Sequence, residues 1–369
     1  SRKPFDAWTT QLFARGHLDA FRNWHESLPR WHSKIRGSND LVKIEHLSAP
    51  TVGDKIKGSM HDGDRVTFEL VLHADELEGE EYIIQQFRDY ISRRDLPCEL
   101  HRRFYAKGLA FIEVIAATEV ITELAIFTPV RAIRGMPPLR AFQPPIRSSS
   151  LPDRVPPLPT EGAISPETRI AIFDGGIPEN HPITQWATPF ELDDLAPPKN
   201  GFYEHGVAVT SAALFGSIDP SEPIEPPFAE VEHYRVIDSD PAQDPYQLYD
   251  VLDRIESILS QRTFDFVNLS IGPRLPIEDD DIHAWTAVLD DRLSRTSTFT
   301  TIAVGNDGES DAPTCLNRIQ VPADAVNAVS VGACDSDLED WQRATYSSVG
   351  PGRSYGRNLL RGPGSRPDG

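Results

Sequence analysis

The chain has 369 residues and a formal net charge of −20, with 36 lysines and arginines against 56 aspartates and glutamates. Its hydrophobic fraction of 39% and its charged fraction of 25% are typical of a soluble globular protein. The negative charge argues against nucleic acid as the main partner, because phosphate binding requires a positive surface, and no apolar run approaches the roughly 18–20 residues of a membrane helix.

The first 141 residues predict a small α+β domain. Large apolar residues recur at helical spacing over residues 6–26, which predicts a helix. Further along, the hydrophobic pattern predicts a sheet with helices on one face, in the order β-α-β-α-β. The expected strands cover residues 65–72, 109–115 and 130–133, and the expected helices cover residues 81–94 and 119–126.

Prolines are frequent over residues 142–166, and three consecutive serines, Ser148, Ser149 and Ser150, lie among them. A segment of this composition cannot form a helix or a central strand, so it predicts an extended, semi-rigid linker. We therefore expect a domain boundary here, with a second domain over residues 167–369.

Strands and helices alternate regularly after this linker. The strands are apolar and β-branched, as expected when helices cover both faces of a sheet. The pattern predicts an α/β fold with a doubly wound, mostly parallel sheet. The expected strands cover residues 168–174, 231–237, 264–271, 299–304 and 326–331, and the expected helices cover residues 205–215, 245–261 and 280–294.

Ligands of open α/β sheets bind beyond the carboxyl ends of the strands, so polar residues at those ends are candidates for a site. Asp174 ends the first strand before two glycines, and His205 begins a helix rich in small residues. Asn306 follows a later strand, where its amide is a suitable donor to an oxyanion. Taken singly, each also fits a turn or a helix cap. Ser270 lies within a strand, which argues against a nucleophile.

The order of these residues resembles the subtilase family. Asp174 matches the family's Asp motif, and His205-Gly206 matches its His-Gly-Thr motif with Val207 in place of Thr. Residues 268–272 resemble the strand that pairs with the substrate backbone, and residues 303–306 resemble the segment with the oxyanion-hole Asn. Later stretches at residues 321–323, 329–333, 346–351 and 366–368 also resemble segments of the family.

The resemblance implies a serine endopeptidase that acts on a polypeptide substrate. Asp174 would orient His205, Asn306 would stabilise the oxyanion, and the backbone of Ser270, Ile271 and Gly272 would pair with an extended substrate. The family's nucleophile lies in a Gly-Thr-Ser motif, which this sequence lacks. We therefore expect a subtilisin-like domain that is incomplete at its C-terminal end and inactive by itself. The alternative is a non-catalytic pseudoprotease that serves as a peptide-binding or sensor module.

The N-terminal domain has two interpretations, a propeptide that blocks the active site or a permanent regulatory domain. The arrangement resembles the cytoplasmic subtilases that bacteria encode beside an AAA-type ATPase in phage-defence gene pairs, which implies an ATPase partner. This resemblance rests on residues 97–103 and on seven residues of the opening helix: Phe5, Trp8, Gly16, Leu18, Phe21, Trp24 and His25.

Three cysteines, Cys98, Cys315 and Cys334, cannot all pair with one another, which indicates a reducing, cytoplasmic compartment. No cofactor and no metal are expected. Cys98 and His101 supply only two ligands, whereas structural zinc needs four. The acidic run at residues 278–281 is compatible with calcium, but a solvated loop and helix start explain it better.

Overall fold

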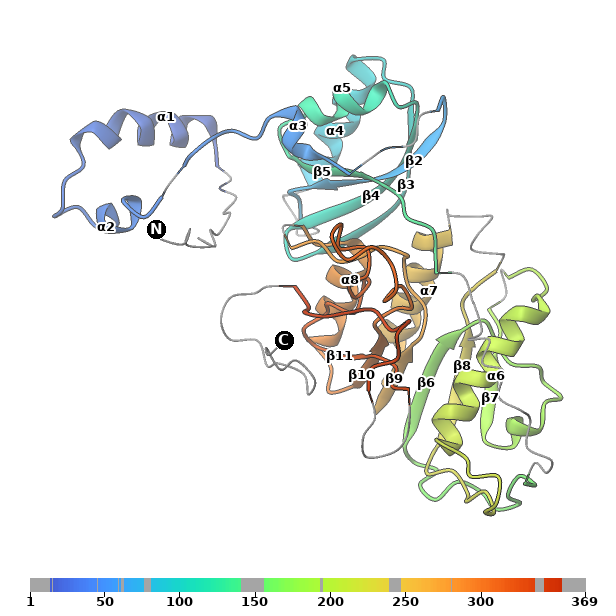
Figure 1. Cartoon of the computed structure of the whole chain (residues 1–369). Coiled ribbons are helices and arrows are strands. Elements are labelled where there is room, and N and C mark those ends of the chain that lie inside the picture. The colour runs from blue at the N-terminus through green and yellow to red at the C-terminus, as the bar shows by residue number, and fades with distance from the viewer. Residues whose placement is uncertain are drawn as a thin grey trace. The chain divides into compact units, whose positions relative to one another are not determined.

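A computed structural model describes residues 14, 16–44, 46–58, 60, 63–75, 81–140, 156–192, 195–238, 247–279, 281–335 and 342–353. The chain divides into two compact units, Ser1–Thr51 and Val52–Gly369. In the first unit, helix α1 (Leu18–Ser27) is followed by a 3-10 turn at Leu28–Arg30 and by the short helix α2 (Ser38–Leu41) (Figure 1). No residue of α1 is buried. The expected helix over residues 6–26 was therefore too long, because residues 14, 16 and 17 are not helical and α1 begins at Leu18; residues 1–13 and 15 lie outside the described residues.

The second unit begins with a five-stranded sheet in the order β1-β5-β2-β4-β3. Its strands are antiparallel to their neighbours except for the parallel pair β1–β5. These strands and their helices are α3 (Val52–Lys55), β1 (Ile56–Lys57), β2 (Val66–Leu72), α4 (Glu81–Arg93), β3 (Cys98–Ala106), β4 (Leu109–Ala116), α5 (Val120–Ile126) and β5 (Val130–Gly135).

Strand β3 corrects the expected β-α-β-α-β order to β-α-β-β-α-β, the split βαβ arrangement. The strand escaped prediction because its first half is polar, with Glu99, His101 and Arg102 exposed. A tight turn at Lys107 and Gly108, both with positive φ, joins β3 to β4. The pairing of β3 with β4 therefore depends on this turn, and the pattern of apolar residues in β3 alone does not predict it.

Both faces of this first sheet are buried. On one face, Phe68, Leu70 and Ile112 pack with Phe87 of α4 and Leu124 of α5. The opposite face belongs to a different core, which it shares with two helices of the following region. The sheet residues in that core are Val71, Phe104, Ala106, Phe111 and Ala132.

A six-stranded sheet follows, in the order β11-β10-β9-β6-β8-β7, and every neighbouring pair is parallel. The predicted α/β class with a mostly parallel sheet is thereby confirmed. The elements are β6 (Arg169–Asp174), a 3-10 helix (Pro182–Gln185), β7 (Ala187–Phe190), α6 (Asn200–Phe215), β8 (Glu230–Arg235), α7 (Gln247–Gln261), β9 (Phe266–Leu269), α8 (Ala284–Leu293), β10 (Phe299–Ala303) and β11 (Val329–Val331).

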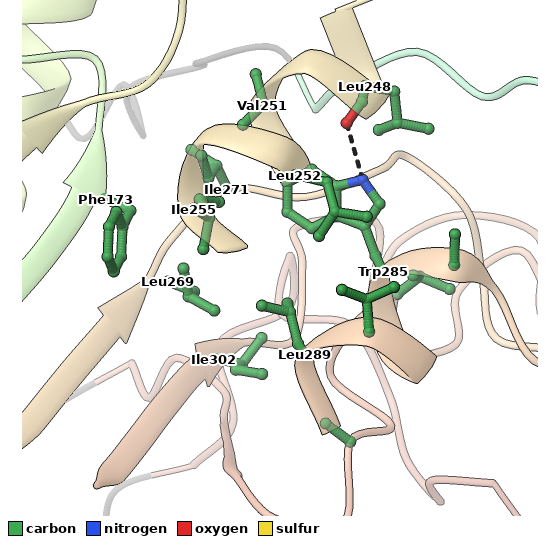
Figure 2. Packing of buried hydrophobic residues seen from close by; sticks show 14 of the residues in the cluster. Phe173, Leu248, Val251, Leu252, Ile255, Leu269, Ile271, Trp285, Leu289 and Ile302 are labelled. Carbon is green, nitrogen blue, oxygen red and sulfur yellow. Dashed lines mark hydrogen bonds between the residues drawn. The ribbon is translucent and has the colours of Figure 1, made fainter. Parts of the chain in front are cut away.

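Helices lie on both faces of this second sheet. Helices α7 and α8 cover one face, where Phe173, Leu269 and Ile302 point from three adjacent strands into one core (Figure 2). The fully buried Trp285 of α8 donates its indole N–H to the Leu248 carbonyl of α7 at 3.0 Å, which fixes one helix against the other. Helix α6 packs on the opposite face. Its Leu214 shares a cluster with Ile172, Trp186 and Val231.

Two expected helix starts were wrong. Helix α8 begins at Ala284 rather than at residue 280, because His283 caps it: the imidazole Nδ1 accepts the Trp285 N–H at 3.2 Å. Helix α6 begins at Asn200, before residue 205. No side chain caps it, so the sequence carries no start signal there.

Candidate active site

Asp174 lies at the carboxyl end of β6, a central strand of the parallel sheet, and is fully buried. Its Oδ1 accepts the Gly175 N–H at 2.6 Å. The two following glycines permit helix α6 to come very close. A Cβ on Gly175 would lie 2.7 Å from the Phe202 carbonyl oxygen, and Gly176 has a φ of +99°. The sequence Asp-Gly-Gly therefore places a buried carboxylate directly beneath α6.

His205 lies in the second turn of α6, not at its start as the sequence suggested. The buried residues Phe202, Gly206, Thr210 and Leu214 recur every fourth position and turn one face of α6 to the sheet. A Cβ on Gly206 would lie 2.0 Å from the Gly176 carbonyl oxygen, so only glycine allows this approach. The contact positions His205 immediately beside Asp174.

The two side chains form a hydrogen bond of 2.7 Å between His205 Nδ1 and Asp174 Oδ1. The histidine side chain is 24% exposed, whereas that of Asp174 is fully buried. A carboxylate bound at Nδ1 fixes the tautomer and stabilises the imidazolium, and proton uptake then takes place at Nε2. This arrangement is suited to general base catalysis at the carboxyl edge of the sheet.

Ser270, Ile271 and Gly272 come directly after β9, which ends at Leu269; the expected strand over residues 264–271 was too long. Ser270 Oγ accepts a hydrogen bond from Asn268 Nδ2 at 2.8 Å, and Ile271 is buried. A Cβ on Gly272 would lie 2.9 Å from the Val321 carbonyl oxygen. Only a glycine at position 272 therefore lets the segment around Val321 approach the backbone this closely.

The chain itself pairs with this segment. Leu139 and Pro273 form an antiparallel bridge, in which Arg140 N–H donates to the Gly272 carbonyl at 2.9 Å and Arg274 N–H donates to the Pro138 carbonyl at 2.8 Å. The Arg140 guanidinium donates to the Ala303 carbonyl at 3.2 Å. Burial lowers the pKa of Arg140 to about 10. Residues 138–140 thus pair with the end of the segment that was expected to bind an extended substrate.

Asn306 is exposed in the loop after β10. Gly305 before it has a φ of +99°. The loop is held by the segment around residues 346–348, because Ser348 N–H donates to the Gly305 carbonyl at 3.0 Å and Gly308 N–H donates to the Tyr346 carbonyl at 2.8 Å. No hydrogen bond between described residues joins Asn306 to Asp174 or His205. The structure thus brings Asp174 and His205 together and places Asn306 in the loop after β10 of the same sheet.

Two polar residues beneath the pair were missed by the sequence analysis. His233 of β8 and Thr210 of α6 are both fully buried and lie 2.8 Å apart between Nδ1 and Oγ1. His233 Nε2 also accepts the Gly176 N–H at 3.1 Å. The signal was present in the sequence, since His233 alternates with Val231 and therefore belongs to a buried face of its strand.

Among the described residues, no group of three or more His, Cys, Asp or Glu side chains is arranged to hold a metal ion. Of the acidic run at 278–281, Asp280 lies outside the described residues. Cys98, Cys315 and Cys334 are free cysteines. None of the described helices combines the length and the apolarity needed to cross a membrane.

A hydrogen-bonded Asp–His pair at the carboxyl edge of a parallel sheet with helices on both faces defines an α/β protein with a site suited to general base catalysis. The subtilase family model matches residues 165–361, more than half of the chain. The chain belongs to the subtilase family, a family of serine peptidases.

One solved structure with similarity to the chain is a mutant of the protease domain of PatA, at 20% identity and a TM-score of 0.35. The matched region covers 51% of this chain and 63% of that domain, so the chain spans less than two thirds of the relative's length. A comparison with curated protein sequences finds no significant match.

Proposed function

We propose that this chain is the larger part of a serine endopeptidase. Asp174 and His205 are two members of its catalytic triad, and a serine outside residues 1–369 is the third. The single observation that carries this proposal is the hydrogen bond of 2.7 Å between His205 Nδ1 and the fully buried Asp174. Such a pair withdraws a proton from a serine hydroxyl and later returns it to the leaving amine.

The reaction is acyl transfer from a peptide bond to the serine, followed by hydrolysis. His205 Nε2 takes the serine proton while Asp174 holds Nδ1 and stabilises the resulting imidazolium. Asn306 donates its amide to the tetrahedral oxyanion, an interaction worth roughly 10²–10³ in turnover when one such donor is lost. The substrate backbone pairs with the segment from Ser270 to Gly272 in the manner of an added strand.

Within the described parts of the chain, one side of the second sheet next to α6 is exposed, which supports a further helix there. The strand register places Phe266, Phe299, Val329 and Val331 on the face that carries α6, and these side chains are 43–50% exposed. A cavity of about 430 Å³, lined in part by Val209 of α6, lies beside them. Large contiguous apolar surfaces of this kind mark sites of association. We propose that the helix bearing the nucleophile covers this face.

The N-terminal sheet has an inhibitory role in this proposal. The antiparallel bridge between Leu139 and Pro273 lies next to the segment that we propose binds an extended substrate. A polypeptide and residues 138–140 would compete for the Gly272 carbonyl, which accepts from Arg140 at 2.9 Å. The sheet therefore acts as a propeptide-like or regulatory domain that restricts access to the cleft.

We further propose that the protein acts in the cytoplasm with an AAA-type ATPase partner in phage defence. The three free cysteines are compatible with a reducing compartment. Of the residues that carry the resemblance to this group, Phe5 and Trp8 lie outside the described residues, whereas Phe21 and Trp24 lie in α1.

The test is covalent labelling with a serine-directed phosphonate. Residues 1–369 are compared with the product of the whole encoding reading frame, and the matched controls are His205→Ala and Asp174→Asn in the longer protein. We expect labelling of the longer protein alone, and its loss in both variants. Labelling of residues 1–369 would refute the placement of the nucleophile. A longer protein that binds peptides but does not label would support the pseudoprotease alternative.

A further inference from the structure

We propose that His233 is a positioning residue for the Asp174–His205 pair. Its neutral imidazole, protonated at Nδ1, accepts a hydrogen bond from the turn that follows Asp174 and donates one to the helix that carries His205. The inference rests on the proposed function for its purpose, because the pair needs fixed geometry only if it is catalytic. The hydrogen bonds themselves are independent of that function.

The position of His233 in the fold places it between both partners. It lies on β8, adjacent to β6, and is paired in register with Ile172. It is fully buried, as is Thr210 of α6. The Gly176 N–H donates to His233 Nε2 at 3.1 Å, and Thr210 Oγ1 lies 2.8 Å from His233 Nδ1. One ring thus links the turn after β6 to α6.

The tautomer follows from the donors. A backbone N–H can only donate, so His233 Nε2 must present its lone pair to Gly176. A neutral ring then carries its proton on Nδ1, which donates to the Thr210 hydroxyl. A doubly protonated ring would place two N–H groups against each other at Gly176. The observed contacts therefore require one specific neutral form of His233.

The turn is held from two sides. On one side the Gly176 carbonyl contacts α6 at Gly206, where an added Cβ would lie 2.0 Å from the oxygen. On the other side the Gly176 N–H is bound by His233. A Cβ on Gly206 would also lie 3.1 Å from His233 Cε1, so the ring contacts the helix as well. Asp174 and His205 belong to the same two elements, and His233 consequently sets their separation.

The burial of Thr210 and His233 is tolerated because the two side chains have hydrogen-bond partners. Two polar side chains within the sheet–helix interface would be costly if they lacked partners. Each ring nitrogen of His233 has one partner. A purely structural role would be met equally well by two apolar residues of similar volume, whereas a directional contact with the Gly176 N–H requires an acceptor.

The experiment uses ¹⁵N-histidine NMR of residues 1–369. We expect His233 in the Nδ1–H form with an unprotonated Nε2, and a separate, slowly exchanging Nδ1–H signal from His205. In Thr210→Val the Nδ1–H of His233 loses its acceptor, so its signal should exchange faster and the link between His233 and α6 should weaken. The exchange rates of the Gly176 amide and the His205 Nδ1–H should then rise about tenfold, as expected for loss of one buried hydrogen bond. Thr210→Ser keeps the hydroxyl and should resemble the parent protein.

A second pair of variants covers the case in which Thr210→Val does not fold. His233→Gln retains a carbonyl acceptor for the Gly176 N–H, and His233→Leu does not, so only the leucine variant should release the amide and shift the His205 signal. An Nε2–H tautomer of His233 would overturn the proposal. So would an unchanged His205 signal in the folded leucine or valine variants. Phosphonate labelling is measured separately, so failure of the proposed function is not confused with failure of this inference.

Discussion

Two buried clusters in this molecule each pair a carboxylate with a histidine, and only one resembles an active site. In the first, Asp174 hydrogen-bonds His205 at 2.7 Å, and the histidine side chain is 24% exposed. In the second, Glu69 of β2 lies 3.7 Å from His283, and both side chains are at most 1% exposed. A carboxylate and a histidine are therefore paired in both clusters, but only the Asp174–His205 pair reaches the surface.

The difference lies in what else surrounds each carboxylate. Glu69 accepts from Arg134 Nε at 2.7 Å and from the Tyr249 hydroxyl at 2.5 Å. Burial raises the pKa of Glu69, but Arg134, His283 and Tyr249 outweigh it and lower the pKa overall. Asp174 has no arginine partner among its described hydrogen bonds, and its Oδ2 has none at all within the described residues. The Glu69 carboxylate is paired with an arginine and buried, so it stabilises the contact between the sheet and the helices. The Asp174–His205 pair has no arginine partner among its described hydrogen bonds and reaches solvent through the partly exposed histidine.

The Glu69 cluster also explains how the first sheet is attached. Glu69 and Arg134 come from that sheet, Tyr249 comes from α7, and His283 caps α8. At the edges of this contact, basic residues of the sheet meet acidic residues of the helices and their loops. These pairs are Arg102 with Asp250 and Asp253, Lys107 with Asp291, and Arg131 with Asp281.

Replacement of the two histidines gives the sharpest contrast and the largest expected effect. In a longer protein that carries the proposed serine, His205→Ala should reduce turnover by about 10⁴–10⁶, because the proposed general base is lost. His283→Ala should leave turnover within about tenfold, because His283 touches no reacting group. Both are measured with one peptide substrate under saturating conditions. Similar losses in the two variants would remove the distinction between the clusters.

Replacement of Arg134 tests the structural cluster. Arg134→Ala leaves the Glu69 carboxylate buried without its main cation, and removal of one partner of a buried ion pair costs about 3–5 kcal/mol. Urea unfolding should show this decrease in the free energy of unfolding. Arg65→Ala is the matched control, since Arg65 pairs with Glu99 at an exposed site and its loss should change stability little. Equal effects would show that Glu69 is not charged in the folded protein.

Both buried histidines should make the fold sensitive to acid. Burial lowers the pKa of His233 and of His283 from 6.5 to about 4. Near pH 5 the unfolded chain therefore binds protons that the folded chain excludes. Stability is fully present above pH 6.5 and falls as the pH decreases toward 4. From pH 7 to pH 5 each histidine should account for about 2 kcal/mol.

The groups around each histidine modify this sensitivity without reversing it. Asp174 favours the charged form of His233 and His205 opposes it. Around His283, Glu69 and Asp324 favour the charged form, whereas Arg134 and Arg353 oppose it. Urea unfolding at pH 7 and pH 5 is the measurement. His283→Gln should weaken the pH dependence. A parent protein equally stable at both pH values would contradict the prediction.

Local sequence was sufficient for part of the fold and part of the site. The parallel sheet could be predicted because apolar stretches, such as residues 170–173 of β6, alternate along the chain with helical patterns. The position of Asp174 could be predicted because an apolar strand that ends before two glycines places its last residue at the carboxyl edge of the sheet. Strand β3 could not, since its polar residues pair only when β4 folds beside it. The start of α6 depends likewise on close packing against Gly175 and Gly176 rather than on a cap.

The contacts of His233 and Arg140 were beyond local sequence for a related reason. Each joins residues far apart in the chain: His233 contacts Gly176 and Thr210, and Arg140 contacts Gly272 and Ala303. A buried histidine in a strand is visible as a pattern, but its acceptor role appears only when the neighbouring turn is in place. Polar contacts between residues far apart in the sequence depend on how the strands and helices are arranged in space. A pattern of apolar residues predicts the strands and helices but not these contacts.

Replacement of Arg140 has the smallest expected effect and tests the connection between the two regions. Arg140→Ala removes the guanidinium contact with the Ala303 carbonyl and weakens the hold of residues 138–140 on the cleft. KM for a peptide substrate of the longer protein should decrease about three- to tenfold, the value of one modest hydrogen bond, with kcat unchanged because the triad is untouched. Arg94→Ala, in the turn that follows helix α4, is the control and should leave KM unchanged, because Arg94 pairs with Glu123 of the first sheet's own helix α5. An unchanged or increased KM in Arg140→Ala would mean that this segment supports the cleft instead of competing with substrate.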